Sequence, residues 1–137
     1  MKLEVVSEKR TKYEVTVRTP ADAYRVLERY RTRHREHFFV LTLDGAHGIT
    51  AVRIVGIGIV NRSLVHAREV FRRAIIDNSA AIVVAHNHPS GSLEPSQEDH
   101  EVTRRLVEAG KLLGIPVLDH LIISRTGFFS FLEQGLM

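Results

Sequence analysis

Hydrophobic and polar residues follow two different periods along this chain, and each period predicts one kind of secondary structure. Segments in which apolar residues alternate with polar ones, or run without interruption, are typical of strands, and they are residues 13–18, 38–43, 50–60, 80–85, 115–123 and 127–131. Segments in which apolar residues recur every three or four positions are typical of amphipathic helices, and they begin near residues 20, 66 and 97. The resulting order, β-α-β-β-α-β-α-β-β, predicts an α/β protein in which helices flank a mixed β-sheet.

Residues with turn and helix-end preferences support these boundaries. Asp44-Gly45 predicts the turn of a hairpin between the second and third strands. Gly56 and Gly58 in the third strand indicate a bulge or a close approach of two backbones. Gly114 is typical of a helix end, and it follows the last predicted helix.

The most apolar strand, residues 80–85, is followed at once by a polar segment. Its sequence AAIVVA has no polar side chain, which is typical of a central strand covered on both faces. Ligand sites in such sheets favour the ends of strands. The loop predicted at 86–96 is therefore the first place to look for chemistry.

Two histidines at the end of this strand are spaced to act together. Side chains at i and i+2 of an extended chain point to the same side, and Pro89 favours extended backbone at His88, so His86 and His88 converge on one point. Neutral imidazole is a usual nitrogen ligand of zinc. Asp99, in the first turn of the helix predicted over 97–113, is the nearest carboxylate for a third ligand. Two His and one Asp would leave a fourth tetrahedral position to water.

The same residues also fit an interpretation without metal. Ser96-x-x-Asp99 matches a capping box, with Ser96 as the N-cap and Asp99 at the third helical position. His86 and His88 would then be ordinary loop histidines. The two interpretations can hold together, since one Ser96 oxygen can both cap the helix and face the site.

Composition restricts the ligands and the compartment. The chain has 137 residues, which suits a single domain over 1–137, and it contains no cysteine but eight histidines. The absence of cysteine excludes a disulfide scaffold, a cysteine nucleophile, Cys-ligated zinc and an iron–sulfur cluster, and it suits the cytoplasm. No apolar run reaches the ~18–20 residues that span a bilayer, and the first residues lack the apolar core of a signal peptide. We therefore expect no membrane contact.

The net charge of +3 is unevenly distributed. Residues 1–35 hold ten Lys or Arg and five Asp or Glu, and the cations are densest between Arg29 and His37. Such a cluster could attract phosphate, but a spacing of two scatters side chains around a helix, so a solvated helix end is the favoured interpretation. DNA is a weakly supported partner, since the sequence shows no helix-hairpin-helix, zinc finger or basic-aromatic ladder.

The spacing of His86-x-His88-Pro89 and Ser96-x-x-Asp99 resembles the metal-binding signature of the JAB/MPN (JAMM) metalloproteases. The chain is more closely similar to the bacterial RadC family, through the blocks VHAREVFRRAI at 65–75, HNHPSG at 86–91, PSQED at 95–99 and LGIPVLDHLIIS at 113–124. The resemblance extends over roughly residues 20–135. RadC proteins usually carry a helix-hairpin-helix region ahead of this domain, and its absence from this sequence indicates a stand-alone or shortened member.

This resemblance implies an α/β JAB/MPN fold related to the cytidine deaminases, with a zinc ion held by His86, His88 and Asp99. It also implies hydrolysis of a peptide or isopeptide bond in a protein or peptide substrate, with Glu36 taking a proton from the metal-bound water and Ser96 stabilising the oxyanion. The sequence alone does not choose Glu36 over Glu28 or Glu69, so this choice rests on the resemblance. Deamination is not expected, because zinc deaminases use an HxE…PCxxC pattern, whereas this chain has His88 and no cysteine. Two alternatives stay open: a DNA-repair-associated DNA-binding module, and a protein-interaction module with little or no turnover.

Four further residues lie within or near these motifs. His120 lies in a strand that is otherwise largely apolar. We therefore expect His120 to be a hydrogen-bonded core residue that supports the site, and not a metal ligand. Its neighbour Asp119 is expected to accept hydrogen bonds as a capping residue or to form an ion pair. Asn87 and Ser90 line the loop and are candidates for contact with substrate.

Overall fold

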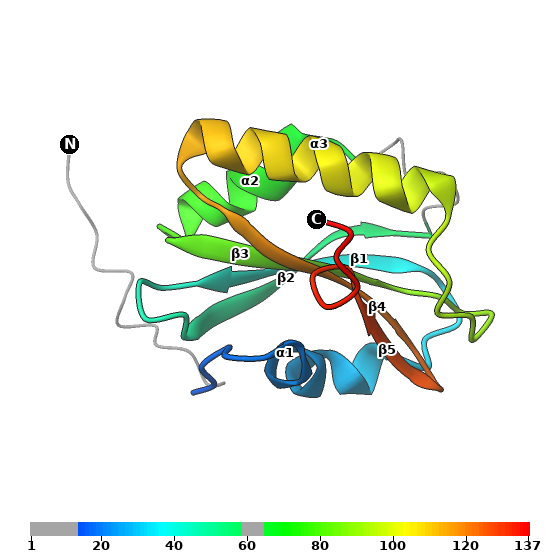
Figure 1. Cartoon of the computed structure of the whole chain (residues 1–137). Coiled ribbons are helices and arrows are strands. Elements are labelled where there is room, and N and C mark those ends of the chain that lie inside the picture. The colour runs from blue at the N-terminus through cyan, green and yellow to red at the C-terminus, as the bar shows by residue number, and fades with distance from the viewer. Residues whose placement is uncertain (1–13, 59–64) are drawn as a thin grey trace.

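The computed structural model describes residues 14–58 and 65–137. Within these ranges, five strands form one sheet in the order β2-β1-β3-β4-β5, and three α-helices cover it (Figure 1). None of these helices is long and apolar enough to cross a membrane. The strands are β1 (His37–Leu43), β2 (Ile49–Ile57), β3 (Ala81–Asn87), β4 (Val117–Ser124) and β5 (Gly127–Ser130). The helices are α1 (Pro20–Leu27), with the 3₁₀ helix η2 (Glu28–Tyr30) directly after it, α2 (Ala67–Ile76) and α3 (Gln97–Leu113).

The sheet is mixed because its strands pair in both directions. β1 pairs antiparallel with β2 and with β3, and β4 pairs antiparallel with β5. β3 and β4 run parallel. A parallel pair needs a crossover connection, and α3 supplies it. The predicted α/β class, with helices flanking a mixed sheet, is confirmed.

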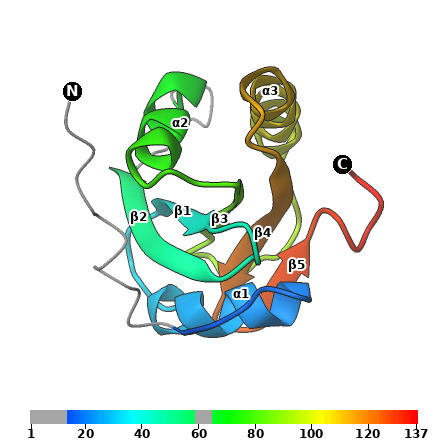
Figure 2. The same cartoon turned by 90° about the vertical axis from the view of Figure 1, so that its left-hand side faces the viewer.

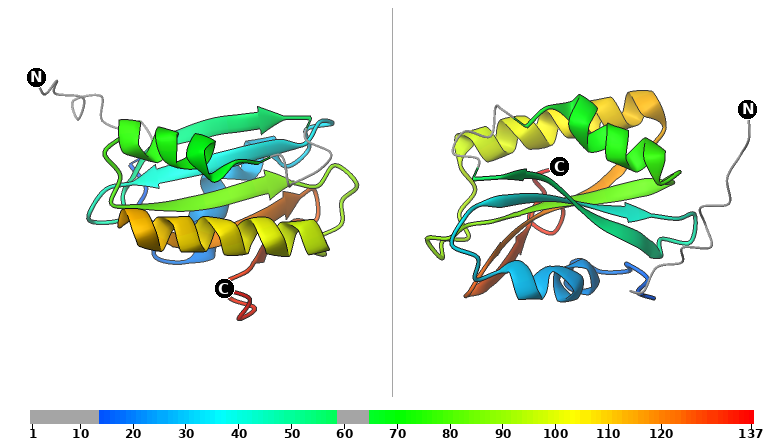
Figure 3. Two further views of the ribbon diagram at one scale, coloured as in Figure 1. Left: turned by 90° about the horizontal axis from the view of Figure 1, so that it is seen from above. Right: turned by 180° about the vertical axis from the view of Figure 1, so that it is seen from behind.

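Helices lie on both faces of the sheet. α2 and α3 lie side by side on one face, and α1 lies on the other (Figures 1 and 2). The view from behind shows the same three layers (Figure 3, right). Alternate strand residues point to opposite faces, so Phe38 and Val40 of β1 pack in the core beneath α2 and α3, whereas Phe39 and Leu41 pack in the core next to α1. β3 lies in the middle and is buried along its whole length, as its apolar sequence predicts.

The segment before α1 differs from its prediction. In place of a strand over 13–18, the described residues form an isolated bridge between Thr16 and Gly48. Glu14 has a left-handed φ of 44°, which breaks extended backbone, and Thr19 already caps the helix. The prediction of a strand here is therefore wrong for the described residues, and residue 13 lies outside them.

The ends of two strands are compared with their predicted positions. β3 continues past the predicted 80–85, so His86 and Asn87 are strand residues rather than loop residues. The predicted irregularity near Gly56 is confirmed by a register shift beside it in the ladder between β1 and β2. The last two positions of the predicted strand, 59–60, lie outside the described residues.

α3 begins and ends at the residues that the sequence predicts. Ser96 is its N-cap: Ser96 Oγ accepts from the Asp99 N–H at 3.1 Å, and the Asp99 carboxylate accepts from the Ser96 N–H at 2.8 Å. Gly114 ends the helix with a φ of 74°, a left-handed conformation that favours glycine. The capping box holds the Asp99 side chain in place at the start of α3.

Candidate metal centre

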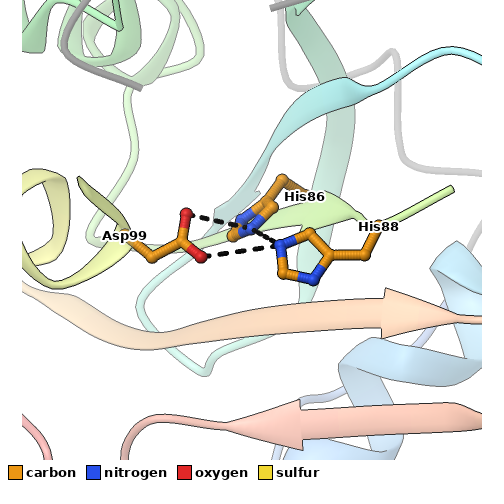
Figure 4. Close-up of side chains that lie close together, drawn as sticks. All are labelled: His86, His88 and Asp99. Atoms are coloured by element: carbon orange, nitrogen blue, oxygen red, sulfur yellow. Dashed lines mark hydrogen bonds and ion pairs between the residues drawn. The ribbon is translucent and has the colours of Figure 1, made fainter. Parts of the chain in front are cut away.

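Two histidines and one aspartate converge at the end of β3. His86 lies in β3 and His88 directly follows it, and both side chains face Asp99 in the first turn of α3 (Figure 4). His86 Nε2 lies 3.0 Å from His88 Nε2 and 3.3 Å from Asp99 Oδ1, and His88 Nε2 lies 3.5 Å from Asp99 Oδ2. Each residue offers one donor atom, and these atoms all lie within 4.8 Å of one another. We call these three residues the ligand cluster.

The distances within the ligand cluster fit a zinc ion. Zinc lies about 2.0–2.2 Å from nitrogen and carboxylate ligands in a tetrahedron, so two of its ligand atoms stand about 3.3 Å apart. The two imidazole nitrogens lie 3.0 Å apart, His86 Nε2 lies 3.3 Å from Asp99 Oδ1 and His88 Nε2 lies 3.5 Å from Asp99 Oδ2, so the two rings approach different oxygens of one carboxylate. With a single carboxylate oxygen as ligand, the three donor atoms lie within 4.8 Å of one another. Two imidazole nitrogens and one carboxylate oxygen are also ligands that zinc accepts in catalytic sites. By geometry and by chemistry, the residues present fit the ion.

Both imidazole rings have a partner on the nitrogen that faces away from the cluster. His88 Nδ1 donates to the Ser92 carbonyl at 2.9 Å, and His86 Nδ1 lies 2.9 Å from His120 Nε2. A hydrogen bond at Nδ1 orients the ring and leaves Nε2 to face a metal. Both rings are therefore oriented as metal ligands require.

The ligand cluster keeps Asp99 ionised although its side chain is fully buried. Burial alone would raise the pKa of Asp99. The neighbouring imidazoles of His86 and His88, with help from the hydrogen bond that the Ser96 N–H donates, outweigh burial and hold this pKa well below its ordinary value of 3.8. Asp99 is thus a negatively charged group at neutral pH, in a place where a buried charge requires a cationic or hydrogen-bonding partner.

A cleft of about 510 Å³ lies beside the ligand cluster. The predicted catalytic residues Glu36 and Ser96 both line it, as do Arg35, Gly58, His88, Pro89, Ser90, Ser92, Glu94 and Glu98. Glu36 is half-buried and directly precedes β1. The structure therefore brings the five predicted site residues to one place, while their roles in metal binding and catalysis stay predictions. Ser90 lines the cleft, and its contact with substrate also stays a prediction.

Asn87, between the two histidines, holds the backbone on both sides of Glu36. Asn87 Oδ1 accepts from the His37 N–H at 2.6 Å, and its amide donates to the carbonyls of Arg33 at 3.3 Å and Arg35 at 3.1 Å. We call residues 33–37 the Glu36 segment. Asn87 is fully buried, so the prediction that it contacts substrate is wrong.

The anchoring role of Asn87 is the functional feature that the sequence did not reveal. Its partners lie about fifty residues away along the chain, so no local spacing could predict them. One weak signal was available: an amide side chain at the end of an otherwise apolar, buried strand must find hydrogen-bond partners inside the protein.

His120 and Asp119 have the core roles that the sequence predicts. His120 is fully buried, with Nε2 toward His86 and Nδ1 at 2.6 Å from Thr103 Oγ1, so it stands behind a ligand rather than among the three donors. Asp119 accepts hydrogen bonds from the Ser130 hydroxyl at 2.6 Å and from two backbone N–H groups. Burial raises the pKa of Asp119, and these hydrogen bonds offset part of that effect.

The cations around residue 33 converge rather than scatter. The residues that line a second cleft, of about 520 Å³, are Arg29, Thr32, Arg33, His34, Arg35, His37 and Ile57. The predicted solvated helix end is confirmed, since Arg33, His34 and Arg35 are exposed and follow the end of η2 at Tyr30. The predicted helical spacing of these side chains is wrong, because the backbone from Tyr30 to β1 is irregular. Arg35 lines both clefts, so the cationic cleft adjoins the cleft beside the ligand cluster. The cations before residue 14 lie outside the described residues.

Comparison with known proteins places this site in a family context. A family model described as RadC-like JAB domain matches residues 17–136. The UPF0758 protein of Trichlorobacter lovleyi is 52% identical over 107 residues, which cover 78% of this chain and 46% of that protein. The UPF0758 protein of Methanospirillum hungatei is 56% identical over 105 residues, covering 77% and 47%, and that of Syntrophomonas wolfei is 45% identical over 126 residues, covering 88% and 54%. The chain spans about half the length of these curated relatives.

Proposed function

Because the chain belongs to the family of RadC-like JAB domains, we propose that it is a zinc-dependent hydrolase of peptide or isopeptide bonds. The observation that carries this proposal is the convergence of His86, His88 and Asp99 beside a cleft that Glu36 also lines. Catalytic zinc sites use three protein ligands and keep one position open, whereas structural sites are closed by a fourth ligand. Among the described residues, the group of candidate ligands at this place has three members.

His86, His88 and Asp99 are the residues that would hold the zinc ion. Bound there, zinc would lower the pKa of a water towards ~7 and polarise a substrate carbonyl. Asp99 contributes a negative charge, and the two rings contribute Nε2. Phe38 stacks on His86 with ring centroids 6.1 Å apart, so an apolar side chain excludes water from one face of this ligand.

Glu36 carries the proton in this proposal. Its carboxylate accepts a proton from the attacking water and then delivers it to the leaving amine, which is general acid–base catalysis by one side chain. Two observations support the role. Glu36 shares the cleft with His88 and Ser96, and Asn87 anchors the backbone on both sides of it.

Ser96 stabilises the oxyanion that develops on the scissile carbonyl. Ser96 Oγ accepts a hydrogen bond from the Asp99 N–H, and a hydroxyl that accepts one bond still has its own hydrogen to donate. Such a donor, already in position, is effective toward a developing negative charge. Capping of α3 and a catalytic role are therefore compatible at Ser96.

The proposed substrate is a protein or peptide, with its scissile bond in the cleft between Glu36 and Ser96. The proposed compartment is the cytoplasm, which suits a chain without cysteine. Zinc deamination is not proposed, because the ligand cluster contains two His and one Asp and the chain has no Cys.

A cleavage screen of a peptide library by the zinc-loaded protein tests this function, with Glu36→Gln as the matched variant. Gln has nearly the same shape as Glu but cannot accept the proton, so we expect cleavage by the wild type and a rate about 10²–10⁴-fold lower for the variant. Zinc content should be equal in the two proteins. A variant as fast as the wild type would refute the role of Glu36, and absence of cleavage by both would favour an interaction module.

Binding of DNA is the second candidate function, and the cationic cleft favours it. The described residues that line this cleft include three arginines and two histidines and no acidic side chain. A gel-shift series over salt concentration tests it, because binding through phosphates weakens steeply as salt rises. We expect the double variant Arg33→Gln/Arg35→Gln to bind more weakly than the wild type if this function is real. No shift even at low salt would exclude it.

A further inference from the structure

A continuous line of hydrogen bonds runs behind the ligand cluster, from α3 through β4 to β3. Thr103 Oγ1 donates to the Asp99 carbonyl at 2.6 Å, one helical turn back along α3. The same oxygen lies 2.6 Å from His120 Nδ1, and His120 Nε2 lies 2.9 Å from His86 Nδ1. All four residues are buried. The line therefore begins at the backbone of one candidate ligand and ends on the ring of another.

The direction of each hydrogen bond follows from its first member. A carbonyl oxygen can only accept, so the single hydroxyl hydrogen of Thr103 is committed to Asp99. Thr103 Oγ1 must then accept from His120, which places the proton of His120 on Nδ1. A neutral imidazole with a proton on Nδ1 has its lone pair on Nε2. His120 Nε2 therefore accepts from His86, and the proton of His86 lies on Nδ1.

We propose that Thr103 and His120 are positioning residues that set the tautomer of His86, so that its Nε2 faces the metal as a ligand. This inference rests on the proposed zinc site. His88 reaches the same state in a simpler way, because its Nδ1 donates directly to the Ser92 carbonyl. His86 is buried within the sheet and meets another side chain at Nδ1, and the hydroxyl of Thr103 gives that side chain a defined direction.

Aromatic packing holds the rings of this line in their planes. Phe131 stacks on His120 with centroids 4.6 Å apart and an interplanar angle of 10°, and Phe38 stacks on His86 at 6.1 Å and 3°. A ring packed in this way cannot rotate to exchange nitrogen for carbon without disturbing the core. The hydrogen bonds, and not rotation of the ring, therefore determine the tautomer of His86.

The matched pair of variants is Thr103→Val and Thr103→Ser. Valine keeps the branched shape of threonine and removes the hydroxyl, so His120 loses the acceptor that holds its proton on Nδ1. His120 can then place its proton on Nε2 and donate to His86 Nδ1, which moves the proton of His86 onto its ligand nitrogen. Serine retains the hydroxyl and should restore the wild-type behaviour.

Long-range ¹H–¹⁵N NMR spectra of the histidine rings, recorded on the metal-free full chain, measure the tautomers directly. We expect a proton on Nδ1 of His86 in the wild type and in Thr103→Ser, and a shift toward Nε2 in Thr103→Val. Zinc affinity, measured by competition with a chromophoric chelator, should fall about 10–100-fold in Thr103→Val, as is usual when a partner behind a ligand is lost.

Two results would overturn the inference. One is a wild-type spectrum in which His86 is protonated on Nε2 and not on Nδ1, and this measurement needs no variant to fold. The other is a folded Thr103→Val protein that binds zinc within about threefold of the wild type, well outside the expected loss. A wild type that takes up no zinc would instead refute the proposed function, since the tautomers are measured without metal.

Discussion

The ligand cluster and the Glu36 segment face the same cleft, but different contacts hold them in place. Asp99 is held by the N-cap of its own helix, and His88 by a carbonyl four residues later, so local backbone geometry accounts for much of the cluster. The Glu36 segment is irregular backbone, and the buried amide of Asn87 anchors it from about fifty residues away.

The proposed metal binding and the proposed turnover therefore have separate structural supports. The cluster depends on a strand end meeting a helix start, whereas the placement of Glu36 depends on tertiary hydrogen bonds across the sheet. We therefore expect changes in the cluster to abolish both metal binding and turnover. Changes around Asn87 should lower turnover and leave the metal bound.

Replacing Asp99 by Asn should have the largest effect. Asn keeps an oxygen that can accept from the Ser96 N–H, so the start of α3 should survive, but it removes the negative ligand. We expect zinc affinity to fall by at least about 100-fold, because even partners behind the ligands typically contribute 10–100-fold. Chelator competition measures the affinity, and the proposed activity should disappear with the metal.

Asp119→Asn is the matched control for this variant. Asp119 is also a buried aspartate, but its partners are Ser130 and backbone N–H groups rather than the imidazoles. One of these N–H groups belongs to His120, but no ligand is lost, so zinc affinity should fall far less than in Asp99→Asn. Equal losses in the two variants would show that zinc affinity depends on general stability and not on the ligand cluster.

Replacing Asn87 by Ala should separate the two halves of the site. Loss of its amide frees the backbone on both sides of Glu36, and a displacement of about 1 Å of a reacting group can lower a rate about 10²-fold. We expect kcat to fall about 10–100-fold, with zinc affinity within about threefold of the wild type, since the misplaced group is the proton carrier rather than a ligand. Steady-state kinetics and a zinc titration on the same preparation measure both.

Ser90→Ala serves as the comparison for Asn87→Ala. Ser90 lines the cleft, and its hydroxyl accepts from the Ser92 N–H at 3.3 Å rather than from the Glu36 segment. We expect any change in this variant to appear in KM rather than in kcat. A tenfold loss of zinc affinity in Asn87→Ala would mean that the two halves share one support.

The same division explains how much of the molecule the sequence predicts. Local spacing and capping preferences predict His86, His88 and Asp99 as neighbours, because a strand end and a helix N-terminus have regular geometry. The strand prediction fails at 13–18, where alternating side chains favour a strand but the left-handed backbone of Glu14 interrupts the extended conformation. Glu36 was predicted through a family resemblance and not through spacing, since its position depends on distant hydrogen bonds.

Gly91→Ala should weaken the loop that holds His88, by less than the changes above. Gly91 has a φ of 91°, and a Cβ there would come within 2.7 Å of the Arg125 guanidinium, which donates to the carbonyls of Pro89 and Ser90. Left-handed backbone costs a non-glycine residue about 1–2 kcal/mol, and loss of each Arg125 hydrogen bond costs about 0.5–1.5 kcal/mol more. We expect lower stability in urea unfolding and a zinc affinity reduced a few-fold.

Gly114→Ala isolates the backbone contribution. Gly114 also has a left-handed φ, of 74°, but a Cβ added there would meet no atom of the described residues within 4 Å. It also ends α3, far along the helix from Asp99. This variant should lose about 1–2 kcal/mol of stability from strain alone and keep its zinc affinity. Equal effects of the two alanines on zinc binding would mean that the Arg125 contacts have no part in placing His88.

The smallest expected effect is a pair of opposite pH dependences in the metal-free protein. The pKa of Asp99 is lowered in the folded state, so its contribution to stability is present above the unfolded value of 3.8 and is lost as pH falls below it. The pKa of Asp119 is raised by burial, so its contribution is greatest below 3.8 and is lost as pH rises through the folded value.

Urea unfolding of the wild type, Asp99→Asn and Asp119→Asn between about pH 3 and 6 measures these contributions, since one proton changes the free energy of unfolding by at most about 1.4 kcal/mol per pH unit. The stability of the wild type relative to Asp99→Asn should rise with pH, because the unfolded state binds the extra proton. Relative to Asp119→Asn it should fall with pH, because the folded state binds it. Slopes of the same sign would mean that burial, and not the imidazole partners, governs the pKa of Asp99.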